Sequence, residues 1–337
     1  MTTLNHQIRL AARPVGLPKP TDWQFTEEHV RDVEGGEVAV KIRYISLDPA
    51  MRGWMNEGKS YIAPVAIGEV MRAGAVGKVI ASRHAGFAVG DAVVGSLGVQ
   101  EYALVPGKAL TKVDTRLAPL PVYLSTLGMP GMTAYFGLLD IGKPLPGQTL
   151  VVSGAAGAVG SLVGQIGRIK GCRVIGIAGG AAKCQYLVSD LGFDASIDYK
   201  AEDVKSALKR LCPNGVDIYF DNVGGEILNT TLAFLARGAR IVICGAISQY
   251  NATAPIVGPS NYLSLLVNRA SMQGMVVFDY ADRYAEAAVV LGGWLAAGKL
   301  KTREDIVQGL NTFPDTLLKL FKGENFGKLI LQVGVDS

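Results

Sequence analysis

Short apolar runs separated by glycines characterise the first third of the chain. Residues 37–47 (EVAVKIRYISL) alternate apolar and polar side chains, as a half-buried strand does. Further short apolar runs follow at residues 77–81, 91–95 and 101–105, with turn residues between them. Short strands separated by turns predict a compact β-rich domain, either a barrel or a sandwich.

The pattern changes near residue 127. From residue 149 onward, near-continuous apolar runs alternate with segments of helical periodicity. Strands that helices cover on both faces are apolar throughout, so the alternation predicts a doubly wound α/β domain with a parallel sheet. The expected elements are strand 149–153, helix 158–170, strand 173–178, helix 182–190, strand 195–199, helix 203–211, strand 216–221, helix 226–235, strand 240–244, strand 272–278, helix 282–297 and strand 328–333.

The first strand–helix junction of this second half carries three regularly spaced glycines. Residues 154–160 read GAAGAVG, with Gly154, Gly157 and Gly160 in a G-x-x-G-x-x-G pattern. The pattern follows a predicted strand and opens a predicted helix, the context that indicates a dinucleotide site. Glycine is needed because a Cβ would keep the backbone from the pyrophosphate, which helix N–H groups bind. A tight turn without a ligand is the simpler alternative.

Composition narrows the range of functions. Glycine accounts for 42 of 337 residues, well above the usual share of about 7%, which fits close approaches of the backbone to a ligand. The net charge is only +4 and no long basic run occurs, so we expect no nucleic-acid partner. Without a long apolar run or an N-terminal apolar leader, we expect no membrane span and a cytoplasmic protein. The four cysteines and three histidines lack metal-ligand spacing, so we expect no metal.

The end of the second predicted strand indicates which dinucleotide binds. NAD sites usually carry Asp or Glu there, on the ribose diol. Here the strand ends IAGG, and residues 160–189 contain no acidic side chain. A 2′-phosphate therefore meets no repelling carboxylate, Lys183 supplies positive charge, and Tyr199 could hydrogen-bond the same phosphate. The sequence thus favours NADP(H) over NAD(H).

Later strand ends lie at the same edge of a parallel sheet, where ligands bind. Asn222 follows the strand 216–221 and is either a ribose ligand or a turn residue. Cys244 ends the strand 240–244, and we interpret it as a packed small residue rather than a nucleophile, because no histidine lies near it in the sequence. Its backbone could still line a nicotinamide pocket.

Several motifs along the chain resemble one family. Residues 47–53 read LDPAMRG, residues 127–135 read LGMPGMTAY and residues 323–328 read GENFGK. With the glycine loop they span nearly the whole chain in order. The chain resembles the zinc-independent medium-chain dehydrogenases/reductases, in the branch of leukotriene hydroxydehydrogenase/prostaglandin reductase and curcumin reductase. The resemblance implies a GroES-like β-rich catalytic domain at residues 1–127, completed by about 301–337, and a Rossmann NADP(H)-binding domain at residues 128–300.

The resemblance also implies an activity, a partner and a set of contacts. The activity is NADPH-dependent reduction of the C=C bond of α,β-unsaturated ketones or aldehydes, with hydride transfer to Cβ. A quinone reductase on the same scaffold and a weakly catalytic NADPH-binding protein are the alternatives. The partner is a second copy of the chain, paired through the strand from Met272 to Phe278. The implied cofactor contacts are Gly157, Ala158, Val159, Gly160, Lys183, Tyr199, Asn222, Cys244, Gly245, Ala246, Ile247, Ser248, Tyr250, Met275, Val276, Val277 and Asn325.

The chain departs from its relatives at two places near the expected substrate. Residues 67–69 read IGE where zinc-dependent relatives carry Gly-His-Glu, which argues against catalytic zinc. Ala50 stands where the branch usually has tyrosine, which widens the pocket. Reduction of an enone needs a hydrogen-bond donor for the developing enolate oxygen. The candidate catalytic residues are Tyr61 and Tyr250, although each could be a packing residue and the cofactor's ribose hydroxyl could supply the bond instead.

Overall fold

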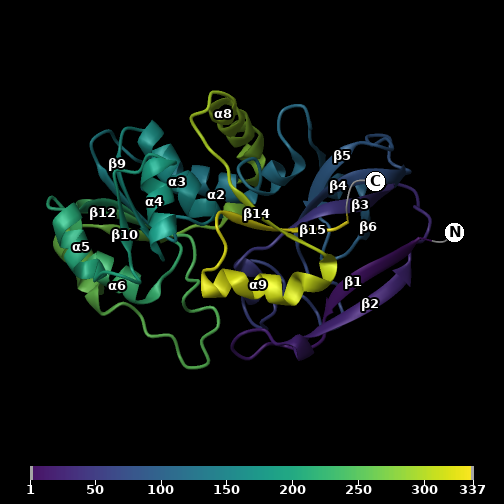
Figure 1. Cartoon of the computed structure of the whole chain (residues 1–337), viewed down its shortest axis with the longest axis horizontal. Helices are drawn as coiled ribbons and strands as arrows, with labels where there is room; N and C mark the ends of the chain where they lie inside the picture. Colours follow the sequence, from purple (N-terminus) through teal and green to yellow (C-terminus); the bar gives the residue numbers. More distant parts are fainter. Residues whose placement is uncertain (1–2, 335–337) are drawn as a thin grey trace. The chain divides into compact units, whose positions relative to one another are not determined.

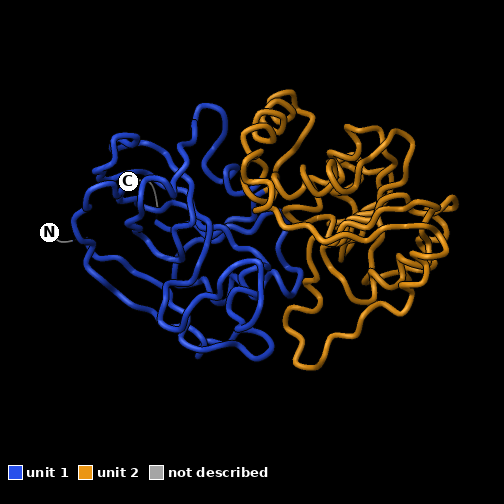
Figure 2. The backbone as a smooth tube through the Cα atoms, turned by 180° about the vertical axis from the view of Figure 1, so that it is seen from behind, with its two compact units in different colours: residues 1–125, 304–337 blue, residues 126–303 orange. Residues whose placement is uncertain are grey.

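The computed structural model describes residues 3–334, which form two compact units (Figure 2). Unit 1 comprises the residues up to Ser125 together with those from Glu304 onward, and unit 2 comprises Thr126–Arg303. Each unit has its own sheet and its own hydrophobic core. Across residues 3–334, no helix is both long enough and apolar enough to cross a bilayer.

Unit 2 contains a six-stranded parallel sheet in the order β10-β9-β8-β11-β12-β13. Figure 1 labels β9, β10 and β12 of this sheet. The strand order reverses between β8 and β11, as in doubly wound dinucleotide-binding folds. The strands are β8 (Thr149–Ser153), β9 (Arg173–Ala178), β10 (Ala195–Asp198), β11 (Val216–Asp221), β12 (Leu235–Ile243) and β13 (Ser271–Gly274). The predicted α/β fold class is therefore confirmed.

Helices cover both faces of this sheet. Val151 of β8 packs in one cluster with Leu208 and Leu232, which come from the helices α5 and α6. Its neighbour Leu150 points to the other face, where it lies against α3 at Gly167. The helices are α2 (Met129–Phe136), α3 (Ala158–Ile169), α4 (Ala181–Ser189), α5 (Val204–Leu211), α6 (Gly225–Leu232), α7 (Ser264–Asn268) and α8 (Tyr284–Ala296), with the shorter turns η4 (Gly137–Gly142), η5 (Ser260–Leu263) and η6 (Val277–Arg283).

The last strand of this sheet corrects one prediction. The expected strand 272–278 is wrong, because β13 covers only Ser271–Gly274 and η6 begins at Val277. The ladder stops because the partner strand β12 ends at Ile243, whose carbonyl accepts the Met275 N–H at 3.0 Å. Beyond that bond, no strand among the described residues pairs with this segment.

Unit 1 is built on a mainly antiparallel sheet in the order β14-β15-β3-β4-β5-β7, with β6 also paired to β3. A separate two-stranded sheet, β1 with β2, lies beside it through bridges at Gln7–Gln100 and Arg9–Val70. The strands are β1 (Leu4–Leu10), β2 (Trp23–His29), β3 (Glu37–Ser46), β4 (Gly74–Ser82), β5 (Ala92–Ser96), β6 (Tyr102–Pro106), β7 (Leu110–Lys112), β14 (Glu304–Gln308) and β15 (Lys328–Gln332). The helices and turns are η1 (Pro20–Asp22), α1 (Ala50–Trp54), η2 (Gly107–Ala109), η3 (Leu120–Leu124), η7 (Leu310–Thr312) and α9 (Phe313–Lys322).

The two ends of the chain meet in the core of unit 1. The α9 side chains Phe313 and Leu317 are fully buried, and the Phe313 ring packs edge-on against Trp23 with centroids 5.0 Å apart. At the start of β15, the buried Lys328 Nζ donates hydrogen bonds to the Leu47 carbonyl at 2.7 Å and to Asp48 Oδ1 at 2.6 Å. The C-terminal segment is thus fastened to the LDPAMRG segment by a buried ion pair.

Candidate functional site

The glycine loop joins β8 to α3 at the carboxyl edge of the unit 2 sheet. Gly157 is the N-cap of α3, and its N–H donates to the Gly154 carbonyl at 3.0 Å. A Cβ at Gly160 would lie 2.4 Å from the Gly154 oxygen and 2.8 Å from the Ala155 Cα, so only glycine lets the helix approach the loop this closely. The first-turn N–H groups of the helix have no helical acceptor and are available to an anion. The loop therefore fits a dinucleotide pyrophosphate.

Two of the residues expected at the adenosine phosphate follow β9 and its neighbour β10. The Tyr199 ring lies directly against Gly179, where a Cβ would stand 2.8 Å from the phenolic oxygen. Lys183 lies in the first turn of α4. Sequence reasoning missed Asp198, whose Oδ1 accepts the Gly180 N–H at 2.8 Å and fixes the turn between them. An aspartate at a strand end, just before the candidate tyrosine, was the feature that could have revealed it.

Asn222 is part of the turn that follows β11. Its Nδ2 donates to the Ser153 carbonyl at 2.7 Å, and its backbone N–H donates to Ser153 Oγ at 2.9 Å. Ser153 Oγ in turn donates to the buried Asp221 carboxylate at 2.7 Å. These bonds show Asn222 as a turn residue; they do not use its Oδ1, and its contact with the ribose stays a prediction.

The loop from Cys244 to Tyr250 is fastened to that same turn. The Ile247 N–H donates to the Asn222 carbonyl at 3.2 Å, and the Ser248 hydroxyl donates to the Val223 carbonyl at 2.6 Å. Burial, reinforced by the negative charge of Asp221, raises the pKa of the Cys244 thiol to about 12. A thiol that stays protonated at neutral pH is a poor nucleophile, which supports the packing interpretation of Cys244.

Tyr250 folds back onto its own loop. Its hydroxyl oxygen accepts the Ala246 N–H at 3.2 Å and lies 2.8 Å from the position of a Cβ at Gly245. The oxygen is thus used as an acceptor, and this bond does not consume the phenolic proton. Met275, the first of the candidates 275–277, follows β13 at the same edge and is buried.

The remaining candidates belong to unit 1. Tyr61 lies in the loop after α1, with 56% of its surface exposed. Asn325 lies in the turn before β15, where its Nδ2 donates to the Gly327 carbonyl at 2.9 Å. Ala50 is the first residue of α1. The structure thus gathers the unit 2 candidates at one sheet edge and places Tyr61 and Asn325 on the other unit.

Two protein-family descriptions match the chain. Residues 6–113 match the N-terminal domain of oxidoreductases, and residues 158–291 match the zinc-binding dehydrogenase domain. The chain is 43% identical to the NADPH-dependent curcumin reductase of Escherichia coli (strain K12) over 338 residues, covering 99% of this chain and 98% of that one. It is 40% identical to the 2-alkenal reductase (NADP(+)-dependent) of Nicotiana tabacum, covering 98% and 97% of the two chains.

A solved structure extends the likeness to three dimensions. CurA from Vibrio vulnificus, crystallised in complex with NADPH, superposes with a TM-score of 0.93 at 48% identity, covering 98% of this chain and 100% of that one. The chain belongs to the zinc-independent medium-chain dehydrogenase/reductase family. Among residues 3–334 of this medium-chain reductase, no three His, Cys, Asp or Glu side chains are grouped to hold a metal ion.

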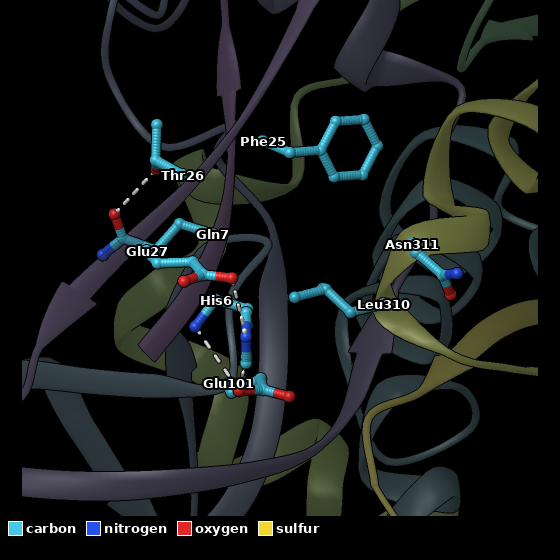
Figure 3. A pocket seen from close by; sticks show the side chains of 8 residues that line it. All are labelled: His6, Gln7, Phe25, Thr26, Glu27, Glu101, Leu310 and Asn311. Carbon is cyan, nitrogen blue, oxygen red and sulfur yellow. Dashed lines mark hydrogen bonds and ion pairs between the residues drawn. The ribbon is translucent and has the colours of Figure 1, made fainter. Parts of the chain in front are cut away.

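A separate hollow of about 420 Å³ lies on unit 1 of the reductase, lined by His6, Phe25, Glu27, Glu101 and Leu310 among others (Figure 3). Its polar groups are paired with one another: His6 Nδ1 lies 2.6 Å from Glu101 Oε2, and Nε2 lies 3.2 Å from Glu27 Oε1. The hydrogen bond to Glu101 raises the pKa of His6. Because none of the candidate cofactor residues lines this hollow, we assign it no part in the reaction.

Proposed function

We propose that the chain catalyses the NADPH-dependent reduction of the C=C bond of α,β-unsaturated ketones and aldehydes, with hydride delivered to Cβ and without zinc. The chain is an NADP-dependent oxidoreductase of the medium-chain family, as its end-to-end likeness to curcumin reductase and 2-alkenal reductase indicates. The observation that carries the proposal is the carboxyl edge of unit 2. There, the glycine loop lies so close to the start of α3 that position 160 has no room for a Cβ, and this loop fits a pyrophosphate. Lys183 and Tyr199 fit a 2′-phosphate.

NADPH supplies the hydride when it is bound. The N-terminus of helix α3 would hold the pyrophosphate, and the backbone of the loop from Cys244 to Tyr250 would line the nicotinamide pocket. Tyr250 or Tyr61 donates a hydrogen bond to the carbonyl oxygen, which stabilises the negative charge of the enolate that forms when the hydride reaches Cβ. A proton from water or another donor then adds to Cα and gives the saturated carbonyl compound. Tyr250 is suited to this because its oxygen accepts the Ala246 N–H, which orients the ring within the loop.

A panel of hydride acceptors tests the proposal. NADPH oxidation is followed with methyl vinyl ketone, crotonaldehyde and naphthoquinone, and the products are identified by mass spectrometry. We expect methyl vinyl ketone and crotonaldehyde to be reduced to the saturated ketone and aldehyde. We expect slower turnover with NADH than with NADPH, because Lys183 and Tyr199 would have no 2′-phosphate to bind. Turnover of naphthoquinone alone would instead support a quinone reductase. Tight NADPH binding without turnover of any acceptor would leave only the weakly catalytic NADPH-binding protein.

Phenylalanine variants of the two tyrosines complete this experiment. We expect Tyr250→Phe or Tyr61→Phe to lower kcat for methyl vinyl ketone by about 100-fold, the effect of losing a positioned donor. The exposed Tyr262→Phe serves as the matched control, since it removes a phenol elsewhere on the surface. If both variants kept full kcat, the hydrogen bond would belong to the ribose hydroxyl of the cofactor.

The expected cytoplasmic location stays a prediction.

We also propose that two copies pair through β13. This strand is at the edge of the sheet, and no strand of the described chain covers its outer side. Exposed apolar side chains cluster nearby, including Leu266 at 76%, Val267 at 65% and Met272 at 39% exposure. An apolar, uncovered edge favours pairing with a second copy. We expect a dimer by sedimentation at micromolar concentration and a monomer after Met272→Lys, and a monomeric unmodified chain would contradict this.

A further inference from the structure

We propose that Asp221 is a positioning residue for the cofactor, which ties together the three backbone segments on which NADPH would rest, two through its buried carboxylate and the third through its backbone carbonyl. This inference depends on the placement of NADPH given in the proposed function. Asp221 is the last residue of β11 and is fully buried. It would act through its neighbours and not by touching the cofactor.

Four groups donate hydrogen bonds to the carboxylate. Oδ1 accepts the Ser153 hydroxyl at 2.7 Å, the Tyr219 hydroxyl at 2.8 Å and the Val223 N–H at 3.0 Å. The Gly224 N–H donates to both oxygens, at 3.0 and 3.1 Å. Gly224 is the N-cap of α6, so the negative charge also lies at the positive end of that helix. The charge is therefore compensated without any cation.

The same residue connects three strand ends. Through Ser153, the carboxylate is tied to the end of β8, which leads into the glycine loop. Through Val223 and Gly224 it shapes the turn that carries Asn222. Its backbone carbonyl accepts the N–H groups of residues 244 and 245, at 2.9 and 3.1 Å, at the end of β12. These are the segments that hold most of the candidate cofactor contacts on the nicotinamide side.

A neutral side chain reproduces this arrangement only in part. An asparagine at position 221 can place its oxygen where Oδ1 lies, but its NH₂ group would then stand in place of Oδ2 and face the Gly224 N–H, donor against donor, and all four donors would lose a charged acceptor. The hydroxyls of Ser153 and Tyr219 can rotate to other acceptors, but a backbone N–H cannot without moving the turn. We therefore expect the turn to shift, and the loop from Cys244 to Tyr250 to shift with it.

A matched control lies at the other end of the same strand. Asp217 Oδ2 accepts the Thr149 N–H at 2.8 Å, so it also ties β11 to β8, but at the edge away from the candidate site. The experiment compares Asp221→Asn with Asp217→Asn in the full chain. Each protein is first shown to be folded by circular dichroism, and the Kd for NADPH is then measured by fluorescence titration.

We expect Asp221→Asn to raise the Kd for NADPH by about 10-fold, the effect of replacing the charged acceptor of several buried donors by a neutral one, and to raise the KM for NADPH more than it lowers kcat. Asp217→Asn should lower the Tm yet keep the unmodified Kd. A purely structural role predicts a lower Tm in both variants with no change in Kd, and that result would overturn the proposal.

Two further variants keep the test decisive if Asp221→Asn does not fold. Ser153→Ala and Tyr219→Phe each remove one donor to the carboxylate, and we expect each to raise the Kd for NADPH by about 3-fold or more. Unmodified Kd values in both would overturn the proposal. The result is separable from the proposed reaction: a chain that binds NADPH but reduces no enone contradicts the proposed function, while the ratio of Kd values still decides the role of Asp221.

Discussion

Replacing Lys328 with methionine is expected to destabilise unit 1 by about 3 kcal/mol, the lower end of the cost of breaking a buried ion pair. Lys328 is only 2% exposed, and its Nζ reaches both the Leu47 carbonyl and Asp48 Oδ1. Burial lowers the pKa of the Lys328 ammonium, while Asp48 opposes that shift. Methionine fills similar space but has no donor, so the Leu47 carbonyl and Asp48 Oδ1 lose the ammonium, and Asp48 keeps only the Ser46 hydroxyl of these two donors. We take the lower end of the cost of breaking a buried ion pair because the Asp48 side chain is 28% exposed and water can reach it.

Urea unfolding of the chain without cofactor measures this loss. Two of the three tryptophans, Trp23 and Trp54, belong to unit 1, so a Trp294→Phe background makes the fluorescence report on that unit alone. Lys78→Met, at an exposed position of the same sheet, should change stability by less than about 0.5 kcal/mol. Adding Asp48→Asn to Lys328→Met should cost less than the sum of the two single changes, because neither charge is then left alone. Strict additivity would show that the two side chains do not interact.

Burial on both faces explains which strands could be predicted from the sequence. The bounds of β8, β9 and β11 match the predicted strands, because a central parallel strand is apolar along its whole length. The start of β12 was missed because Arg237 and Gly238 interrupt the apolar run. The strand β1 was missed because buried Asn5 and Gln7 break the alternation, and both are paired with Gln100. Such pairing over more than ninety residues is invisible to a local pattern.

Some residues of the candidate site could likewise be predicted from a local pattern in the sequence, and others could not. The glycine loop could be predicted because its spacing is local and its strand and helix flank it directly. The contact between Ser153 and Asp221 could not, because the two residues are 68 positions apart and meet only when β8 and β11 pair. Asp198 was missed for a similar reason, since its partner Gly180 follows a different strand. Sequence therefore predicts the groups that would face a ligand, and the structure adds the buried groups that hold those groups in place.

Replacing Gly160 with alanine is expected to weaken NADPH binding by about 5- to 150-fold, which corresponds to about 1–3 kcal/mol of overpacking. The new Cβ would stand 2.4 Å from the Gly154 oxygen and 2.8 Å from the Ala155 Cα. Both are backbone atoms, so no side chain can turn aside to relieve the contact, and the loop must move away from α3. Because the loop shape is what fits the pyrophosphate, the loss should show in the Kd measured by titration of NADPH.

The same substitution separates binding from folding. Alanine favours a helix by about 1 kcal/mol over glycine, which offsets part of the strain, so we expect the Tm of the cofactor-free protein to change little. Gly293→Ala is the matched control, because it lies in α8 with open space around its Cβ position and ordinary backbone angles. It should keep the Kd for NADPH and leave the Tm equal or higher. If Gly160→Ala bound NADPH as tightly as Gly293→Ala, the pyrophosphate would not rest on this loop, and the cofactor site would have to lie elsewhere.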